Sequence, residues 1–180
     1  TTVTSADPAK LTPLPDHVSA ELKRLDHVGL RTLEDCMQTV FEDGPKRDRR
    51  LWIGDLRLQA IANYATFRNF DLVKRCLFLF ASMRLEGGEV GACVFEKPQP
   101  HVDDTLLYDY SLLFVATLYD YYTESGDTET LQQLWPVAWE QLLIGLRRLD
   151  EKHLMKDDPT WWCFIDWHQA LNKQASAHGV

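Results

Sequence analysis

The chain has 180 residues, 45% of them hydrophobic, with a formal net charge of −8 at pH 7. A chain of this length and composition can bury a hydrophobic core as a single domain. The negative charge disfavours nucleic acid and anionic membrane surfaces, because both would repel the protein as a whole. We therefore expect a neutral or small partner, with no nucleic-acid and no membrane partner.

Targeting signals are not visible in the sequence. No apolar run approaches the roughly 18 to 20 residues that a membrane-spanning helix needs, and residues 1–8 lack the basic-then-apolar plan of a signal peptide. Localisation stays open, because an internal fragment of a secreted protein would also lack a signal. The widely spaced cysteines are predicted to be buried free thiols: Cys36, Cys76, Cys93 and Cys163.

The first half of the chain predicts a strap and three helices. Residues 1–15, rich in Thr and Pro, predict an entry strap. Apolar residues at three- and four-residue steps then predict a helix from about Asp16 to the start of a charged stretch, residues 43–55. Asp55 is expected to cap the second helix, and a third helix is expected over residues 70–84.

The second half predicts a long loop and further helices. The loop over residues 88–103, at about 15 residues, exceeds the usual helix-helix connection, which favours a binding role. A fourth helix is expected over residues 105–124 and a fifth from Asp127. Pro136 predicts a kink or restart in the fifth, because proline disrupts a helix interior. A sixth helix is expected after Trp167.

Strand signals are weak, and the only β-like run is Val90–Phe95 inside the long loop. The predicted fold class is therefore all-α. Helices joined by alternating short and long connections indicate antiparallel hairpins, either stacked as a solenoid or arranged around a barrel.

The charged stretch 43–55 is the strongest functional signal. It places three carboxylates, four cations and a tryptophan between two predicted helices. A helical fold has little structural reason to gather these charges around one aromatic ring. Carboxylates can accept hydrogen bonds from sugar hydroxyls, and a flat aromatic ring can stack on the C–H face of a sugar. The composition is typical of a sugar-handling loop.

A family resemblance follows from this stretch. Asp43-x-Pro45-x-x-Asp48-x-x-x-Trp52-x-Gly54-Asp55 resembles, without a gap, the active-site signature of the α-L-rhamnosidase family of six-hairpin (α/α)6 glycoside hydrolases. The resemblance spans about residues 16–180. Further family motifs are matched in the same order by Asp109-Tyr110-Ser111-Leu112, by Tyr121 to Asp127, and by Phe164-Ile165-Asp166-Trp167.

The resemblance implies hydrolysis with inversion of terminal α-L-rhamnosyl or similar 6-deoxy-sugar residues. In such enzymes a general acid protonates the leaving oxygen while a general base activates water from the opposite face. Asp48 stands at the place of the general acid, although the family's usual acid is the longer glutamate. A gapped alignment with another family branch puts Arg49 there instead, which would make the site inactive. The implied substrate-binding residues are Asp43, Arg47, Trp52, Asp55, Asp166 and Trp167.

The resemblance also implies that the catalytic domain is incomplete. The family's general base lies on a later hairpin, so residues 16–180 are expected to be the first half of a six-hairpin domain and to be inactive alone. The expected partners are a carbohydrate substrate and the remainder of the parent chain, with no cofactor.

Other interpretations remain open. In one, Asp55 is only a helix cap and residues 47–50 are a solvated edge. In a second, the protein is a catalytically silent carbohydrate-binding or scaffolding domain; in a third, it is a helical protein-interaction solenoid with an extended apolar groove. His101, Asp103 and Asp104 could offer metal ligands, but such loop clusters are mostly solvated, so no metal is expected.

Overall fold

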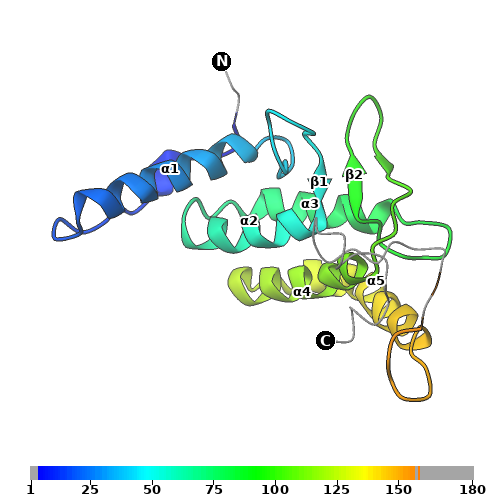
Figure 1. Cartoon of the computed structure of the whole chain (residues 1–180). Coiled ribbons are helices and arrows are strands. Elements are labelled where there is room, and N and C mark those ends of the chain that lie inside the picture. The colour runs from blue at the N-terminus through cyan, green and yellow to red at the C-terminus, as the bar shows by residue number, and fades with distance from the viewer. Residues whose placement is uncertain (1–3, 157, 159–180) are drawn as a thin grey trace.

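The structure, a computed structural model, describes residues 4–156 and 158. These residues form two antiparallel helical hairpins, a preceding helix and a small sheet (Figure 1). The expected all-α class is confirmed, with the sheet as an addition. The helices are α1 (Ala20–Cys36), α2 (Ile53–Ala65), α3 (Phe70–Ser82), α4 (Tyr108–Ser125) and α5 (Thr128–Arg147).

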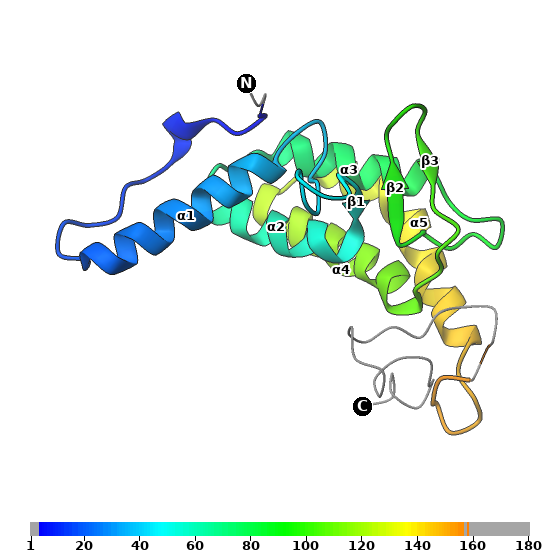
Figure 2. The same ribbon diagram turned by 45° about the horizontal axis from the view of Figure 1, so that its top comes forward.

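The two hairpins, α2–α3 and α4–α5, lie side by side with the same polarity (Figures 1 and 2). Gly54, at the start of α2, lies against Tyr110, at the start of α4. Lys74, near the start of α3, forms an ion pair of 3.1 Å with Asp127, just before α5. The N-terminal ends of α2 and α4 therefore meet at one end of the bundle.

Short polar side chains set the turns within both hairpins. Asn69 caps α3 by accepting from the Leu72 N–H at 3.0 Å, while the side chain of Asn63 bonds both backbone groups of Asn69. In the second hairpin, Gly126 ends α4 in a left-handed conformation with φ of 70°. Asp127 then caps α5 directly, so the Gly-Asp pair allows a sharp reversal.

The sheet was not predicted. β1 (Leu51–Trp52) pairs antiparallel with β2 (Cys93–Phe95), which pairs with β3 (His101–Val102). β1 comes from the charged stretch and β2 from the long loop, so the two segments that the sequence singled out are joined through backbone hydrogen bonds. The sheet lies at the end of the bundle where α2 and α4 begin (Figure 2).

One hydrophobic core fills the space between the hairpins and the sheet. Cys36, Cys76 and Cys93 are buried free thiols, as predicted, whereas Cys163 lies outside the described residues. The largest fully buried side chains include Phe41, Phe67, Phe80 and Phe114.

The predicted limits of the first helix were wrong, and the restart that was one of two alternatives at Pro136 does not occur. α1 begins at Ala20, capped by Ser19, and ends at Cys36, because Met37 and Phe41 pair across a buried turn. α5 is continuous through Pro136 with no restart. Leu134 and Ala138, on either side of the proline, are both buried, so we attribute the continuity to their packing, which offsets the lost hydrogen bond.

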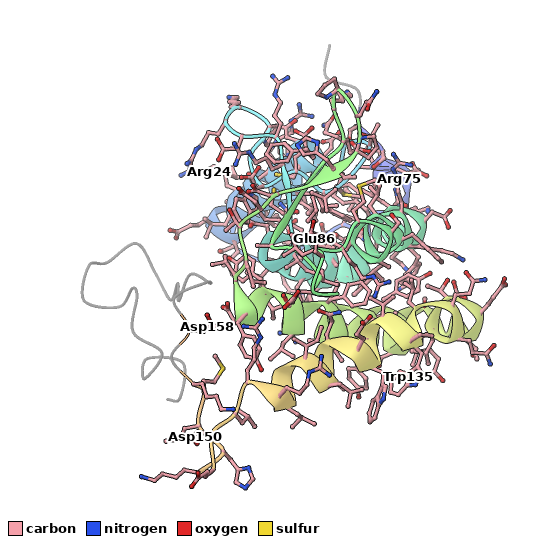
Figure 3. The ribbon with its side chains drawn as sticks, turned by 90° about the vertical axis from the view of Figure 1, so that its right-hand side faces the viewer. Arg24, Arg75, Glu86, Trp135, Asp150 and Asp158 are labelled. Atoms are coloured by element: carbon pink, nitrogen blue, oxygen red, sulfur yellow. The ribbon has the colours of Figure 1, made fainter. Side chains whose placement is uncertain are left out.

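Apolar side chains remain exposed on α1 and α5. Leu22, Leu25 and Val28 are 56%, 64% and 58% exposed on the part of α1 that extends away from the bundle (Figures 1 and 2). On α5, Trp135 and Trp139 stack with centroids 6.0 Å apart and are about half exposed. Trp135 points away from α4 (Figure 3). Within the described part of the chain, no helix is long and apolar enough to cross a membrane.

Candidate active site

Asp43 holds the charged loop, residues 43–50, in a closed shape. Its Oδ1 accepts from the N–H groups of Gly44 at 2.8 Å and Arg50 at 3.0 Å. Its own N–H donates to the Arg50 carbonyl at 2.9 Å. Among the described residues, Oδ2 has no hydrogen-bond donor. Asp43 therefore orders the loop with one oxygen and leaves the other for a ligand.

Asp55 is the third residue of α2, not its cap. The residue before the helix is Trp52, whose side chain makes no capping bond. Burial raises the pKa of the half-buried Asp55 carboxyl, and the negative charge of Asp43 raises it further. A hydrogen bond from the backbone N–H of Asp55 lowers this pKa by a smaller amount. Asp55 is thus a half-buried carboxyl whose protonation is favoured by its own burial and by the charge of Asp43.

Trp52 and Tyr110 form the aromatic part of the site. Their rings pack edge to face, with centroids 6.3 Å apart and an interplanar angle of 88°. Burial raises the pKa of Tyr110, and the charge of Asp55 adds to this, which places the phenol near that carboxylate.

Gly54 makes this approach possible. A Cβ atom there would lie 2.8 Å from Cζ of Tyr110 and 2.9 Å from its hydroxyl. Any other residue would push the tyrosine away. Tyr110 was not among the predicted site residues, although it lies within the Asp109-Tyr110-Ser111-Leu112 motif, and this position was the available signal.

Arg47 and Asp48 lie in the exposed part of the loop. Burial raises the pKa of the Cys93 thiol on β2 to about 12, and the negative charges of Asp43 and Asp48 contribute in the same direction. β2 is the strand that pairs with Trp52. Asp166 and Trp167, the other two predicted contacts, lie outside the described residues.

Part of the long connection supports the charged loop. The Arg50 guanidinium lies over the Phe95 ring, 4.7 Å from its centroid. Glu96 accepts from Arg75 of α3 at 2.7 Å and also from the hydroxyl of Thr39. These contacts fix the β2–β3 hairpin against the segment that leads into the loop.

The residues considered as metal ligands have other contacts. His101 stacks on Phe95 with centroids 4.7 Å apart, and Asp103 accepts from the Thr105 hydroxyl at 3.1 Å. Across residues 4–156 and 158, no three His, Cys, Asp or Glu side chains gather in a way that could hold a metal ion.

Comparisons with known proteins agree with the motif. Residues 19–179 match the model of the bacterial α-L-rhamnosidase six-hairpin glycosidase domain. A comparison with curated proteins gave no match.

Two solved structures are similar. A rhamnosidase from Klebsiella oxytoca with rhamnose bound is 49% identical, with a TM-score of 0.86 over 96% of this chain and 34% of that one. A rhamnosidase of Bacillus sp. GL1 is 21% identical, with a TM-score of 0.74 over 87% of this chain and 16% of that one, and shows the fold alone. This chain thus spans about a third of the Klebsiella chain. It belongs to the bacterial α-L-rhamnosidase family of six-hairpin glycosidase domains.

Proposed function

We propose that the natural protein containing this sequence is an inverting glycoside hydrolase that removes terminal α-L-rhamnosyl or similar 6-deoxy-sugar residues. The observation that carries the proposal is the packing of Trp52 on Tyr110 at the start of α2, where the charge of Asp43 acts on the half-buried Asp55, in a bundle of the rhamnosidase family. The rhamnose bound to the Klebsiella protein supports a carbohydrate substrate.

In this proposal the two carboxylates hold sugar hydroxyls. Oδ2 of Asp43 and the carboxylate of Asp55 each accept from a hydroxyl, and such charge-assisted hydrogen bonds are strong in a partly desolvated site. Trp52 offers an apolar surface to the sugar ring. Arg47, Asp166 and Trp167 complete the proposed contacts.

Asp48 is proposed as the general acid. Its short side chain must reach the leaving oxygen, and an error of about 1 Å at a reacting group costs about a hundredfold in rate. Because Asp48 is exposed, a bound substrate or a further segment of the parent chain must enclose it for catalysis.

We further propose that residues 16–180 are the first half of the catalytic domain and are inactive alone, with the general base on a later hairpin. The exposed apolar face of α1, formed by Leu22, Leu25 and Val28, supports this proposal, because such a face favours burial. We propose that the remainder of the parent chain packs on this face of α1.

The test is hydrolysis of an aryl α-L-rhamnoside by the longest natural chain that contains this sequence. We compare the parent with Asp48→Asn and with the control Asp26→Asn on the exposed side of α1, and follow the product anomer by NMR. We expect inversion, unchanged turnover in the control and a loss of at least about a hundredfold in Asp48→Asn.

A folded parent that binds rhamnose but cleaves no aryl glycoside from a wider panel would contradict the proposal. That result would favour a catalytically silent carbohydrate-binding domain. Full activity of Asp48→Asn would reject Asp48 as the acid without rejecting hydrolysis.

A further inference from the structure

A cavity lies beside the charged loop. It encloses about 880 Å³ between the end of α1, the N-terminal strap, the loop and the β2–β3 hairpin. Lys46 and Arg49 line it from the loop and Lys97 lines it from the hairpin, whereas Arg47 and Asp48 do not. We call this cavity the cationic cleft. The loop thus presents different residues to the cleft and to the candidate active site.

Cations outnumber carboxylates in the cleft, which Arg31, Lys46, Arg49 and Lys97 line together with Asp35 and Glu42. Arg31 at its edge is paired with Glu34 at 3.0 Å and with Asp35 at 2.9 Å. By contrast, Lys46, Arg49 and Lys97 form no ion pair with any described residue. In a chain with a net charge of −8, three unpaired cations around one cavity favour an anionic ligand.

Arg49 is held toward this cleft by an unusual backbone. Its φ is 54°, in the left-handed region that non-glycine residues rarely adopt, and its Nε donates to the Pro45 carbonyl at 2.7 Å. Such conformations cost about 1 to 3 kcal/mol and cluster at ligand sites. The loop therefore bears strain at a residue that lines the cleft.

The remaining lining is suited to hydroxyl groups. Gln38, Thr39 and Glu42 also line the cleft. Burial raises the pKa of Glu42, while Arg49 and Lys97 lower it, so these cations act on the acid beside them. A simple inorganic anion would use the cations alone. A ligand with one acidic group and several hydroxyls would use both kinds of lining.

We propose that the cationic cleft binds an acidic sugar residue, a uronate, whose carboxylate meets Lys46, Arg49 and Lys97 and whose hydroxyls meet the polar lining. A volume of about 880 Å³ is sufficient for one or two sugar rings. The assignment of this uronate to the substrate, beyond the residue that is cleaved, rests on the proposed function. The binding of a uronate to the cleft does not.

The test is calorimetric titration of the longest natural chain containing this sequence with sodium glucuronate, glucose and sodium sulfate. We expect glucuronate to bind at least about tenfold more tightly than glucose or sulfate, with an affinity that falls as salt rises. The double variant Lys46→Gln/Lys97→Gln should weaken glucuronate binding by at least about tenfold. The matched control Lys152→Gln/Lys156→Gln, in the connection after α5, should bind as the parent does.

Three outcomes would overturn the inference: no glucuronate binding, equal binding of sulfate, or binding unchanged in the cleft variant. Circular dichroism and turnover of a neutral aryl rhamnoside show whether that variant is folded, because neither lysine belongs to the proposed catalytic site. Rhamnoside turnover without glucuronate binding would reject the proposed uronate site and leave the proposed function in place. Glucuronate binding without turnover of any glycoside would reject the proposed function alone.

Discussion

Two aspartates, one near the start of α2 and one just before α5, have opposite environments. Asp55 opens α2 and Asp127 caps α5, and both lie in motifs shared with the rhamnosidase family. Burial and a second carboxylate raise the pKa of Asp55. Hydrogen bonds from the backbone and hydroxyl of Thr130 are the main causes that hold the pKa of Asp127 far below its usual range.

The difference separates a carboxylate that the fold pairs from one that we propose binds a sugar. Asp127 is surrounded by donors: the Thr130 N–H at 2.9 Å, the Thr130 hydroxyl at 2.7 Å, the Tyr121 hydroxyl at 2.9 Å and Lys74 at 3.1 Å. Asp55 has no such partners among the described residues and lies near Asp43. A half-buried carboxylate that the fold does not pair is available for a ligand.

Among the changes that test this comparison of the two aspartates, the largest expected effect comes from Asp55→Asn. Loss of a charged acceptor for sugar hydroxyls should lower turnover of an aryl rhamnoside by about 10- to 100-fold. The free energy of unfolding of the variant at neutral pH should not fall, although its turnover does. The folded state raises the pKa of Asp55 and therefore binds its proton more tightly than the unfolded state does. The contribution of Asp55 to stability thus decreases as the pH rises from its pKa in the unfolded state through its pKa in the folded state.

The variant should therefore be at least as stable as the parent at pH 7, with a smaller loss of stability between pH 4 and 7. Thermal unfolding across that range and steady-state kinetics measure the two parts. A variant that is less stable at neutral pH would assign Asp55 a structural role.

The next effect concerns the contact between Gly54 and Tyr110. Gly54→Ala places a methyl group 2.8 Å from the tyrosine ring, and such overpacking costs about 1 to 3 kcal/mol. Gly29→Ala is the matched control, because nothing lies within 4 Å of its added Cβ on exposed α1. It should stabilise the helix by up to about 1 kcal/mol. Chemical denaturation measures both changes, and equal effects would reject the contact.

The turns within the two helical hairpins could be predicted from the sequence better than the sheet that joins the charged loop to the long connection. Hairpin turns follow local chemistry, so Asp127 and the α3 region could be predicted from capping residues and apolar spacing. The sheet could not, because its strands are two or three residues long and β1 lies far from β2 in the chain. Such short pairings depend on tertiary packing and leave little periodicity to recognise.

The candidate site shows the same limit. The motif named Asp43 and Asp55, but the hydrogen bonds of Asp43 within its own loop and the contact of Tyr110 with Gly54 depend on how β1 and α4 meet. The Asp55 side chain was expected to cap α2, whereas the helix begins two residues earlier. The spacing of the motif was enough to select the candidate residues. Their hydrogen bonds, burial and neighbours could be described only from the folded structure.

A smaller effect is expected from the structural aspartate. Asp127→Ala removes the cap of α5 and should lower the free energy of unfolding by about 0.5 to 2 kcal/mol. Asp127→Asn keeps an acceptor for the Thr130 N–H and should lose less free energy of unfolding.

The contribution of Asp127 to stability should depend on pH. Because the folded state lowers the pKa of Asp127, this contribution is present above the unfolded value near 3.8 and is lost as pH falls through and below it. Urea denaturation of parent and variants at pH 3 and pH 7 should therefore show a smaller difference at pH 3, and a difference independent of pH would contradict this reading.

The smallest effect concerns the cation paired with Asp127. Lys74 is 38% exposed, so its ion pair is screened by solvent and should contribute at most about 1 kcal/mol. Lys74→Met keeps the apolar stem of the side chain and removes the charge. Its loss of stability should shrink in 1 M salt, and Lys152→Met should show no loss. A loss well above 1 kcal/mol that shrinks in salt would mean that the ion pair contributes more than the Thr130 and Tyr121 donors to holding Asp127. A loss that salt does not change would mean that Lys74 acts through packing and not through its charge.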